Sequence, residues 1–443
     1  MTATLPAQAC DVLIIGGGPA GAAAACLLAR QGRKVVLTEK AHHPRFHIGE
    51  SLLPASVALF ERLGLGGELE RIGMPKWGVE FISPVHSHTS RLEFADAWDK
   101  TMPYAWQVRR SELDEIMFRH AAQEGATALE GCRVDEVVFE DGAARVRATG
   151  DDGRQHHWRA RMVLDASGRD TFLARQLGTK RKNEQHNSAA LFGHFTNATR
   201  LPGRQAGDIS ILWFAHGWFW FIPLADGSTS LGAVCWPPYL KSRDKPLTAF
   251  FEDTIALCPA LAERLKSAAL VDDAVYATGN YCYSATRSSG PQHLLLGDAF
   301  AFVDPVFSSG VHLALASAFA AAELVAVELD APARAPAARR RFDALMRKGP
   351  REFSWFIYRM TNPAIREMFM HPRNPLRVKE ALLSLLAGDI HGRTPIWWSL
   401  AAFKAIYYVQ SLRMAPAAFA AWRARRRNIA PTGALRGENI LAD

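Results

Sequence analysis

The stretch at 11–21, DVLIIGGGPAG, constrains the fold more than any other part of the chain. Its first half is apolar on both faces, which is typical of a central parallel strand covered on two sides. Gly16, Gly18 and Gly21 then match the pattern G-x-G-x-x-G. In that pattern the glycines allow a tight turn, a close approach of backbone to a pyrophosphate, and close packing of the following helix. The stretch predicts a dinucleotide-binding unit at the start of the chain.

The residues that follow agree with this interpretation. Pro19 suits the first turn of a helix, and the Ala-rich run at 20–30 continues it, so that the positive helix end would face the phosphates. A second strand, expected at 34–38, ends at Glu39, where an acidic side chain can accept a ribose hydroxyl. An ordinary turn would also tolerate these glycines. Because strand, glycine turn, helix and Glu39 follow one another in this order, we expect a bound adenine dinucleotide.

Composition sets limits on the rest of the chain. With 443 residues, 49% hydrophobic and 22% charged, it can bury a large core and form about two or three structural units. Its six cysteines form no C-x-x-C pair, which argues against both a zinc site and a disulfide framework. The first strand begins within ten residues and no basic and apolar leader precedes it, so a cytoplasmic location is expected.

The formal net charge is +8, with arginine-rich runs at 339–341 and 423–427. Such runs are usually solvated faces, although an acidic protein, an anionic substrate or lipid headgroups could also bind them. No nucleic-acid-binding motif accompanies them, so no nucleic-acid partner is expected.

Four later segments point to a family. The loop FHIGES at 46–51 is similar to one in the flavin monooxygenase superfamily that includes para-hydroxybenzoate hydroxylase. WQVRRSELD at 106–114, VLDASGR at 163–169 and HLLLGD at 293–298 follow in that superfamily's order. Each alone could be a strand end followed by a polar turn. Together they resemble the superfamily, which implies that the dinucleotide is FAD rather than NAD.

The resemblance also implies which residues hold FAD. Asp298 is expected to hydrogen-bond the ribityl chain, and Gln107 and Arg110 to contact the cofactor. The full implied set is Gly16, Gly18, Pro19, Ala20, Gly21, Glu39, Lys40, Gly49, Glu50, Ser51, Gln107, Arg110, Val134, Asp165, Gly168, Asp298, Gly310 and Val311. No metal site is expected.

The strand HGWFWFIP at 216–223 narrows the resemblance. Its alternate residues place Trp218, Trp220 and Ile222 on one face. A structural strand with aromatic side chains in the core would show the same pattern. However, W-x-W-x-I-P, completed by Pro223, is similar to the signature of the flavin-dependent halogenases. The resemblance implies a wall that keeps the organic substrate away from the flavin.

A second segment, GDAFAFVDPVFSSG at 297–310, resembles the halide-binding loop of the same family. A long Ala-rich helix is expected at 311–329, and Ser308 and Ser309 can cap it. The resemblance implies a halide at Ser309 and Gly310, whereas simple capping would use the same residues without a halide. Phe307 stands where tryptophan halogenases have glutamate, so it is assigned to the tunnel wall and disfavours indole specificity.

Lys76, in the segment MPKWG at 74–78, resembles the catalytic lysine of the halogenases. A lysine considered alone is more often a surface charge. The resemblance implies that this one directs hypohalous acid to the substrate. It could do so as an ammonium that donates a hydrogen bond, or as a free amine that forms a haloamine, and burial would favour the amine by lowering its pKa.

The predicted fold class is α/β, with a Rossmann-like FAD-binding domain of the GR2 type formed by 1–75, 105–180 and 288–330. The segments 76–104 and 181–287 are expected to form a mainly antiparallel sheet that faces the substrate. The last segment, 331–443, is expected to be helical, with separate helices in the Arg-Ala run, at 352–360, at 376–386 and at 396–412. The apolar stretch at 396–412 is interrupted by polar residues, so membrane contact is possible but not expected.

The resemblance implies chlorination or bromination of an electron-rich phenol or pyrrole, free or tethered to a carrier protein, by FADH2 and oxygen. A flavin hydroxylase would explain the FAD motifs but not the two tryptophans or Lys76. A non-catalytic flavoprotein is the third possibility. Because no second G-x-G-x-x-G follows a strand, a partner flavin reductase is expected to supply FADH2. The general base, the ring and the choice of halide are left open.

Overall fold

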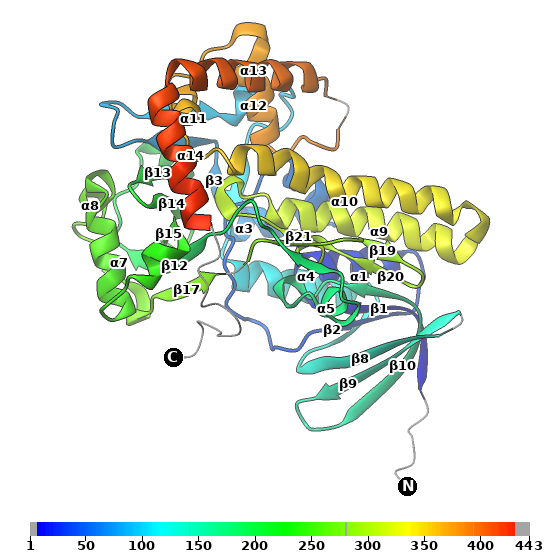
Figure 1. Ribbon diagram of the computed structural model, residues 1–443. Helices are drawn as coiled ribbons and strands as arrows, with labels where there is room; N and C mark the ends of the chain where they lie inside the picture. Colours follow the sequence, from blue (N-terminus) through cyan, green and yellow to red (C-terminus); the bar gives the residue numbers. More distant parts are fainter. Residues whose placement is uncertain (1–6, 141, 280, 393, 430–443) are drawn as a thin grey trace.

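The computed structural model describes residues 7–140, 142–279, 281–392 and 394–429. Two eight-stranded sheets dominate it, one lying beside the long helices and the other beside the C-terminal helices (Figure 1). This arrangement confirms the predicted α/β class with a second, mainly antiparallel sheet.

The first sheet contains the glycine-rich unit. Its order is β19-β20-β10-β1-β2-β7, and β1 pairs in parallel with both β2 and β10. The central strands are buried by helices, which accounts for their continuous apolar sequence. The strands are β1 (Gln8–Ile15), β2 (Val35–Thr38), β7 (Thr127–Leu129), β8 (Cys132–Glu140), β9 (Ala143–Gly150), β10 (Gln155–Asp165), β19 (Ser289–Gly290) and β20 (His293–Leu295). The helices beside it are α1 (Pro19–Arg30), α4 (Arg110–Gln123) and α9 (Gly310–Asp330).

The second sheet has the order β16-β12-β15-β14-β13-β4-β5, and β17 also pairs with β12. Only β13 and β4 pair in parallel among its described strands. Its strands are β4 (Gly78–Ile82), β5 (Ser90–Glu93), β12 (Ala189–Thr196), β13 (Ile209–Phe214), β14 (Gly217–Pro223), β15 (Thr229–Cys235), β16 (Ala269–Leu270) and β17 (Tyr276–Gly279).

The alternation predicted for β14 is observed. Trp218, Trp220 and Ile222 belong to the core that the sheet shares with the C-terminal helices. Phe219 and Phe221 point to the opposite face and pack in a separate core under α7 (Leu247–Ala256) and α8 (Pro259–Arg264). Both faces of this sheet are therefore covered.

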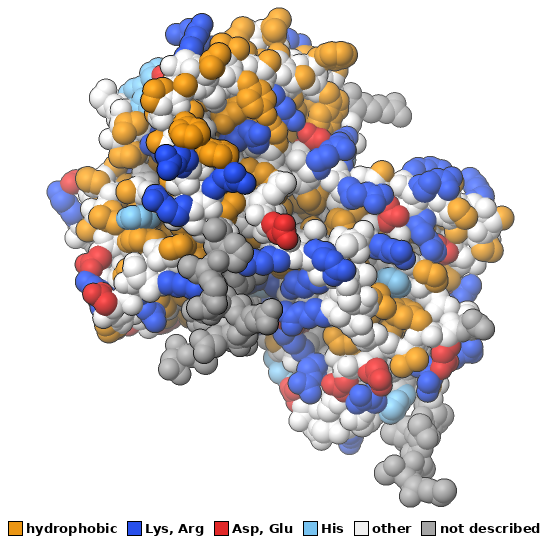
Figure 2. Space-filling model, viewed as in Figure 1, with side chains coloured by type: hydrophobic (Ala, Val, Ile, Leu, Met, Phe, Trp, Pro, Cys, Tyr) orange, Lys and Arg blue, Asp and Glu red, His pale blue; other side chains and the backbone are white. Residues whose placement is uncertain are grey.

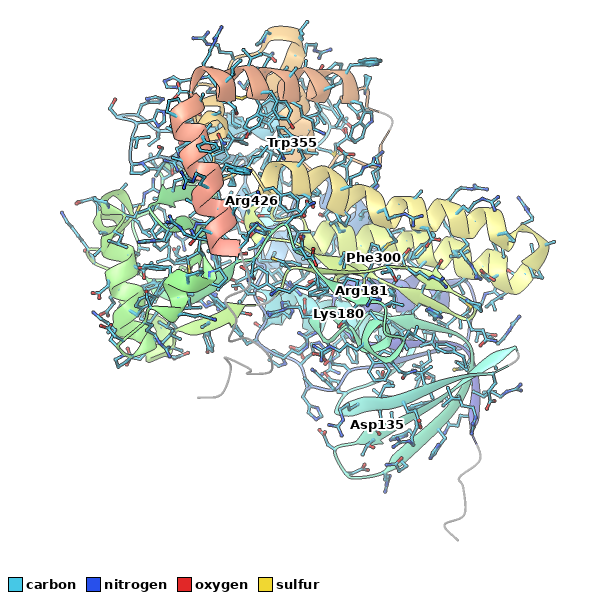
Figure 3. All side chains as sticks on the ribbon, viewed as in Figure 1. Asp135, Lys180, Arg181, Phe300, Trp355 and Arg426 are labelled. Carbon is cyan, nitrogen blue, oxygen red and sulfur yellow. The ribbon has the colours of Figure 1, made fainter. Side chains whose placement is uncertain are left out.

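Smaller elements connect the two sheets. The pair β3 (Met74–Lys76) and β6 (Ala105–Gln107) carries two residues implied in the site. The other elements are α2 (Pro54–Arg62), α3 (Gly66–Ile72), α5 (Phe172–Gln176), α6 (Pro237–Lys241), β11 (Lys180–Lys182), β18 (Tyr283–Ala285) and β21 (Ala301–Phe302). Figure 3 labels Lys180 and Arg181 on β11 and Asp135 on β8.

The C-terminal helices differ from the sequence expectation. A break was expected before 352, but α10 (Ala335–Ile357) runs through Pro350 without interruption. Proline inside a helix costs about 3 kcal/mol. Tertiary packing outweighs that cost here, because the neighbouring Gly349 lies against Leu313 of α9 so closely that an added Cβ would be 2.4 Å from Cδ2 of Leu313.

Four further helices complete the layer, namely α11 (Pro363–Met370), α12 (Val378–Leu386), α13 (Trp397–Arg413) and α14 (Ala415–Ile429). The first and last of these had not been predicted. Trp355, labelled in Figure 3, joins α10 to α13 by packing edge-on against Tyr407 and Phe403. Indole and phenol rings prefer this geometry, so the layer is a packed unit.

Among the described helices, α9 alone is long and apolar enough to cross a membrane. More than half of its apolar window, 56%, is buried, and it packs against α1 and α10. It is therefore a core helix of this fold. The candidate stretch at 396–412 forms α13, which buries Leu400, Phe403 and Tyr407 and leaves Trp398 and Leu412 exposed.

Candidate functional site

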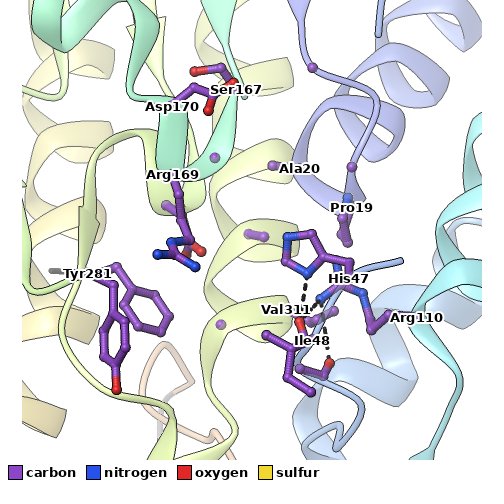
Figure 4. A pocket seen from close by; sticks show the side chains of 18 of the residues that line it. Pro19, Ala20, His47, Ile48, Arg110, Ser167, Arg169, Asp170, Tyr281 and Val311 are labelled. Atoms are coloured by element: carbon purple, nitrogen blue, oxygen red, sulfur yellow. Dashed lines mark hydrogen bonds between the residues drawn. The ribbon is translucent and has the colours of Figure 1, made fainter. Parts of the chain in front are cut away.

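A cavity of about 790 Å³ lies at the carboxyl ends of the parallel strands. It extends from the glycine turn after β1 to the face of β12, β13 and β14 in the second sheet. Figure 4 shows His47 and Arg110 on one side of it and Arg169 and Tyr281 on the other. The carboxyl edge of a parallel sheet is where such folds bind ligands, because the strand order reverses there and opens a crevice.

The glycine turn has the geometry predicted from its sequence. Gly16 has a φ of +103°, and an added Cβ would lie 2.4 Å from the carbonyl oxygen of Ala166. An added Cβ on Gly21 would lie 1.9 Å from the oxygen of Gly16. By contrast, a Cβ on Gly18 would meet nothing closer than the Arg45 guanidinium at 3.5 Å, so Gly18 leaves an open cradle toward the cavity.

Helix α1 starts at this cradle without a side-chain cap. Its first-turn N–H groups therefore remain available to an anion, as at other phosphate-binding helix ends. Pro19 and Ala20 line the cavity beside them, as predicted. Glu39 also lines it, and its carboxylate accepts hydrogen bonds from the backbone N–H of Gly17 (2.8 Å) and of Ala41 (3.0 Å). These bonds fix the carboxylate at the end of β2.

Positively charged side chains surround the same end of the cavity. Those lining it are Lys40, Arg45, Arg110, Arg133 and Arg169. Guanidinium and ammonium groups, together with free backbone N–H groups, are the donors that a pyrophosphate requires. The residues present therefore fit the diphosphate of FAD.

The loop at 46–51 forms one wall. Glu50 is 1% exposed and its Oε1 lies 2.9 Å from Nε2 of His194 on β12, which ties the loop to the second sheet. Gly49 and Ser51 line the cavity on either side of it. Nδ1 of His47 lies 2.6 Å from the Ile48 oxygen, and burial lowers the His47 pKa to about 4, so its ring stays neutral.

The other residues implied to hold FAD divide into two groups. The first group lines the cavity and consists of Val134, Gly168, Asp298, Gly310 and Val311. Burial raises the pKa of Asp298 to about 6, although Arg110 and Arg169 oppose the shift. A carboxyl poised in this way can either accept or donate a hydrogen bond near neutral pH.

Asp165 and Gln107 lie outside the lining. Asp165 is fully buried and accepts the backbone N–H of Ser167 (3.0 Å) and Leu173 (2.7 Å), which shapes the turn that follows β10. Nε2 of Gln107 donates to the Gly207 oxygen at 3.1 Å. Their direct contact with FAD stays a prediction, and in this structure both support the residues around the site.

The predicted halide loop opens into the cavity. Ser308, Ser309 and Gly310 all line it. Ser309 occupies the cap position of α9, but its side chain makes no capping hydrogen bond. The expected capping is therefore absent, and the first N–H groups of α9 remain free for an anion. Phe307 does not line the cavity, because it packs against Phe353 and Phe356 of α10.

Trp218, Trp220 and Ile222 line the far side of the cavity, whereas Pro223 ends the strand outside it. Nε1 of Trp220 donates to Oγ of Ser230 at 3.2 Å. The ring lies flat against Gly232, where an added Cβ would be 2.1 Å from Cζ2. The indole therefore has a fixed position in the wall.

Lys76 lies behind the cavity rather than in its lining. It is 1% exposed, and its Nζ donates to Oγ of Ser51 at 2.9 Å and to the Leu52 oxygen at 2.7 Å. Burial lowers its pKa from 10.5 to about 7, while Asp208 opposes the shift. Since Ser51 does line the cavity, one hydrogen bond separates the amine from it.

Several lining residues carry no signal in the sequence. Arg45 reaches both Glu39 (3.5 Å) and Asp114 (3.3 Å), and Tyr281 presents its ring below Arg169. Both residues reach the cavity from loops, and neither belongs to a recognisable motif. Arg169 lies inside the VLDASGR segment, so its position next to Gly168 was the one available signal.

The pKa of Lys76 predicts a pH-dependent stability. Below pH 7 the amine is charged in both the folded and the unfolded chain, so folding carries the full cost of burying the charge. Between about pH 7 and 10.5 only the unfolded chain holds the proton, and stability rises with pH. Relative to Lys76→Met, the free energy of unfolding of the natural chain should gain on the order of a few kcal/mol across this window. Urea denaturation of both proteins at several pH values measures it, and a constant difference would contradict the shifted pKa.

Comparison with known proteins agrees with this geometry. Residues 9–337 match the family described as FAD binding domain. The flavin-dependent halogenase rdc2 of Metacordyceps chlamydosporia is 35% identical over 341 residues, which cover 71% of this chain and 64% of that protein. The chain thus spans somewhat less than two thirds of that relative.

Solved structures extend the similarity to nearly the whole chain. The myxobacterial chondrochloren halogenase CndH is 31% identical, with a TM-score of 0.77 over 92% of this chain and 97% of that one. A flavoprotein/dehydrogenase from Cytophaga hutchinsonii, 26% identical, has a TM-score of 0.84 and covers 92% and 100% of the two chains. The glycine cradle and these similarities together show that the chain is an FAD-binding protein and belongs to the flavin-dependent halogenases.

Proposed function

We propose that this chain uses reduced FAD, oxygen and chloride or bromide to halogenate an electron-rich aromatic ring. One observation carries the proposal. The uncapped start of α9 and the Trp218 and Trp220 wall line the same cavity as the glycine turn that fits FAD. Nucleotide binding alone would require neither of these two features.

Reduced FAD, when bound, would supply the electrons that activate oxygen, and oxygen would be the oxidant of the halide. The chain's own residues bind and orient the reactants. The glycine turn and the cations around it hold the diphosphate, and Asp298 lies where it can hold the ribityl chain. Halide binds at the free N–H groups of Ser309, Gly310 and Val311, which the positive end of α9 favours. The apolar wall excludes water and the organic ring from this part of the cavity.

Lys76 receives the hypohalous acid that forms from oxidised halide. Its two hydrogen bonds to Ser51 and Leu52 hold Nζ in one position, so the halogen is delivered to one place. In the final step the ring carbon bonds to the halogen, the ring loses a proton, and the oxygen of the acid leaves as water. The pH dependence of product formation distinguishes the two forms of Lys76. Product formation should rise with pH through about pH 7 if the free amine acts, and fall if the ammonium acts.

The proposed substrate is a phenol or a pyrrole, either free or tethered to a carrier protein. Phe307 in place of glutamate in the halide loop argues against an indole. Helix α14 carries several arginines together with the exposed Phe419 and Trp422, and we propose it as the place where an acidic carrier protein would dock. Figure 2 shows hydrophobic and basic side chains side by side on the surface of the C-terminal helices.

A separate flavin reductase is the proposed source of FADH2. The sequence has a single G-x-G-x-x-G after a strand, and the described strands form one dinucleotide-binding sheet, in which β1 pairs in parallel with β2 and β10. We further propose that the chain works in the cytoplasm.

The test is an incubation with a reductase, FAD, oxygen, both halides, and matched free and carrier-tethered phenols and pyrroles. Halogenated product from the tethered set alone would assign a carrier partner, and product from the free set would remove that partner. Failure of every ring with chloride and with bromide would contradict the proposed activity.

The wall provides a prediction of its own. Trp220→Ala should lower the ratio of halogenated to oxygenated product by roughly tenfold or more, because the ring substrate could then approach the flavin. Trp220→Phe is the matched control and should keep most of the ratio. Product masses measure it, with FAD content checked in both variants, since removal of a buried tryptophan also costs stability. An unchanged ratio in the alanine variant would contradict the role of the wall.

A flavin hydroxylase is the second candidate, and one observation favours it. The cavity is continuous from the glycine turn to Trp218 and Trp220, so oxygen transfer to a ring within the same space is geometrically allowed. In that case the product ring would carry one additional oxygen atom, and the reaction would not require halide.

A further inference from the structure

A group of histidines lies outside the cavity and plays no part in the proposed reaction. His86 and His88 belong to the loop that joins β4 to β5, and Glu367 and His371 lie at the end of α11. We call these four residues the histidine cluster. The fold brings together two segments that are 281 positions apart at His86 and Glu367, whose Nε2 and Oε2 are separated by 3.0 Å.

The three imidazole rings of the cluster lie close together. Their centres are 5.8 Å apart for His86 and His88, 5.5 Å for His86 and His371, and 4.7 Å for His88 and His371. Two imidazoles that share one tetrahedral ion, with metal–nitrogen distances of about 2.1 Å, have ring centres roughly 5 Å apart, close to the 5.5 Å between His86 and His371. One donor atom each from His86, Glu367 and His371 already lies within 4.8 Å of the other two.

Neighbouring groups orient two of the rings. Nδ1 of His86 lies 2.8 Å from Oγ of Ser83, and Nε2 of His88 lies 3.0 Å from the Met370 oxygen. Metal-binding histidines usually bond in this way through the nitrogen that does not touch the metal, which fixes the ring for the ion. In His86 the opposite nitrogen, Nε2, is then the one available to a metal.

The local charges also suit a cation. The ion-pair partners of Glu367 within the described ranges are His86 and His371, neither of which is a permanent cation. A second group with similar spacing, Cys26, His120 and Glu124, differs in this respect. There the guanidinium of Arg30 lies 3.3 Å from His120 and 2.5 Å from Glu124, so a positive charge already occupies the site.

We propose that the histidine cluster binds one divalent transition-metal ion of the zinc class. Its protein ligands are His86, His371 and Glu367, and water fills the fourth position. Two imidazoles, one carboxylate and water match the ligand preference of such ions. The scattered cysteines had argued against a zinc site, but this donor set needs none of them.

The ion would fasten the C-terminal helices to the substrate-facing sheet. Phe369 of α11 already packs against Phe81 of β4 at 4.7 Å between ring centres. Strand β4 begins two residues after Lys76. A metal that joins the β4–β5 loop to α11 would therefore stabilise the part of the sheet that positions Lys76, without touching FAD or halide.

The test uses the untagged full chain after treatment with a chelator. Titration with Co²⁺ should give visible d–d absorption that saturates at one ion per chain, and calorimetry should show Zn²⁺ displacing it. His86→Ala and His371→Ala should each weaken binding by more than roughly tenfold. His42→Ala is the matched control, because His42 is an exposed histidine paired with a single carboxylate, Asp151, and its removal should leave binding unchanged.

Thermal unfolding gives a second readout that does not depend on activity. Zn²⁺ should raise the melting temperature of the natural chain and of His42→Ala but not that of His371→Ala, since a ligand stabilises only a fold that binds it. His371 is half exposed, so its replacement should leave the fold intact. Absence of saturable Co²⁺ binding, or equal binding in the double variant His86→Ala/His371→Ala, would overturn the proposal.

Discussion

Replacing Lys76 with methionine is expected to lower halogenated product at least about 100-fold while FAD binding stays unchanged. The methionine fills the same buried volume without a nitrogen that could hold hypohalous acid. Lys76 lies behind Ser51 and outside the lining of the cavity, so its loss should not disturb the cofactor. The measurement combines product quantification by mass spectrometry with FAD affinity from flavin fluorescence.

Lys182→Met is the matched control, because Lys182 is exposed on β11 and does not line the cavity. It should halogenate as well as the natural chain. If Lys76→Met retained halogenation within a few fold, the lysine would be a structural residue and the delivery step would need another group. If it lost FAD as well, the effect would be on folding or cofactor binding.

Replacing Gly18 with valine should weaken FAD binding by at least about 100-fold and leave the fold intact. The new side chain has room in the protein, since the nearest atom to its Cβ is the mobile end of Arg45 at 3.5 Å. It would instead occupy the cradle in which the diphosphate is expected. Circular dichroism and thermal unfolding without flavin check the fold, and a flavin titration measures the affinity.

Gly67→Val tests the same change at a position without a cofactor role. Gly67 lies in α3, and an added Cβ there meets nothing within 4 Å. This variant should bind FAD normally. Normal FAD affinity in Gly18→Val would mean that the cofactor lies elsewhere in the cavity.

The sequence predicted the parts of the fold that depend on local chemistry. The glycines at 16 and 21 match backbone positions that a side chain could not occupy, and the two-residue period of β14 placed Trp218 and Trp220 on one face. Helices that depend on packing were harder to predict. The continuity of α10 through Pro350 comes from its contact with α9, which no local pattern records.

The same distinction holds for the site. Motif residues such as Gly18 and Ser309 were found because their chemistry is local to a turn or a helix end. Arg45 and Tyr281 were missed because they reach the cavity from loops through long-range contacts. The burial of Lys76 and its bond to Ser51 likewise depend on two segments that meet only in the folded chain. The histidine cluster is an extreme case, since His86 and Glu367 are 281 positions apart in the sequence.

The most direct measurement of the central claim is the mass of the product made with chloride, with bromide and with neither halide, under the same supply of reduced FAD and oxygen. The account predicts a chlorine isotope pattern, a bromine isotope pattern and no modified ring, respectively. A ring that gains one oxygen at the same rate in all three reactions would contradict it and would identify the chain as a hydroxylase.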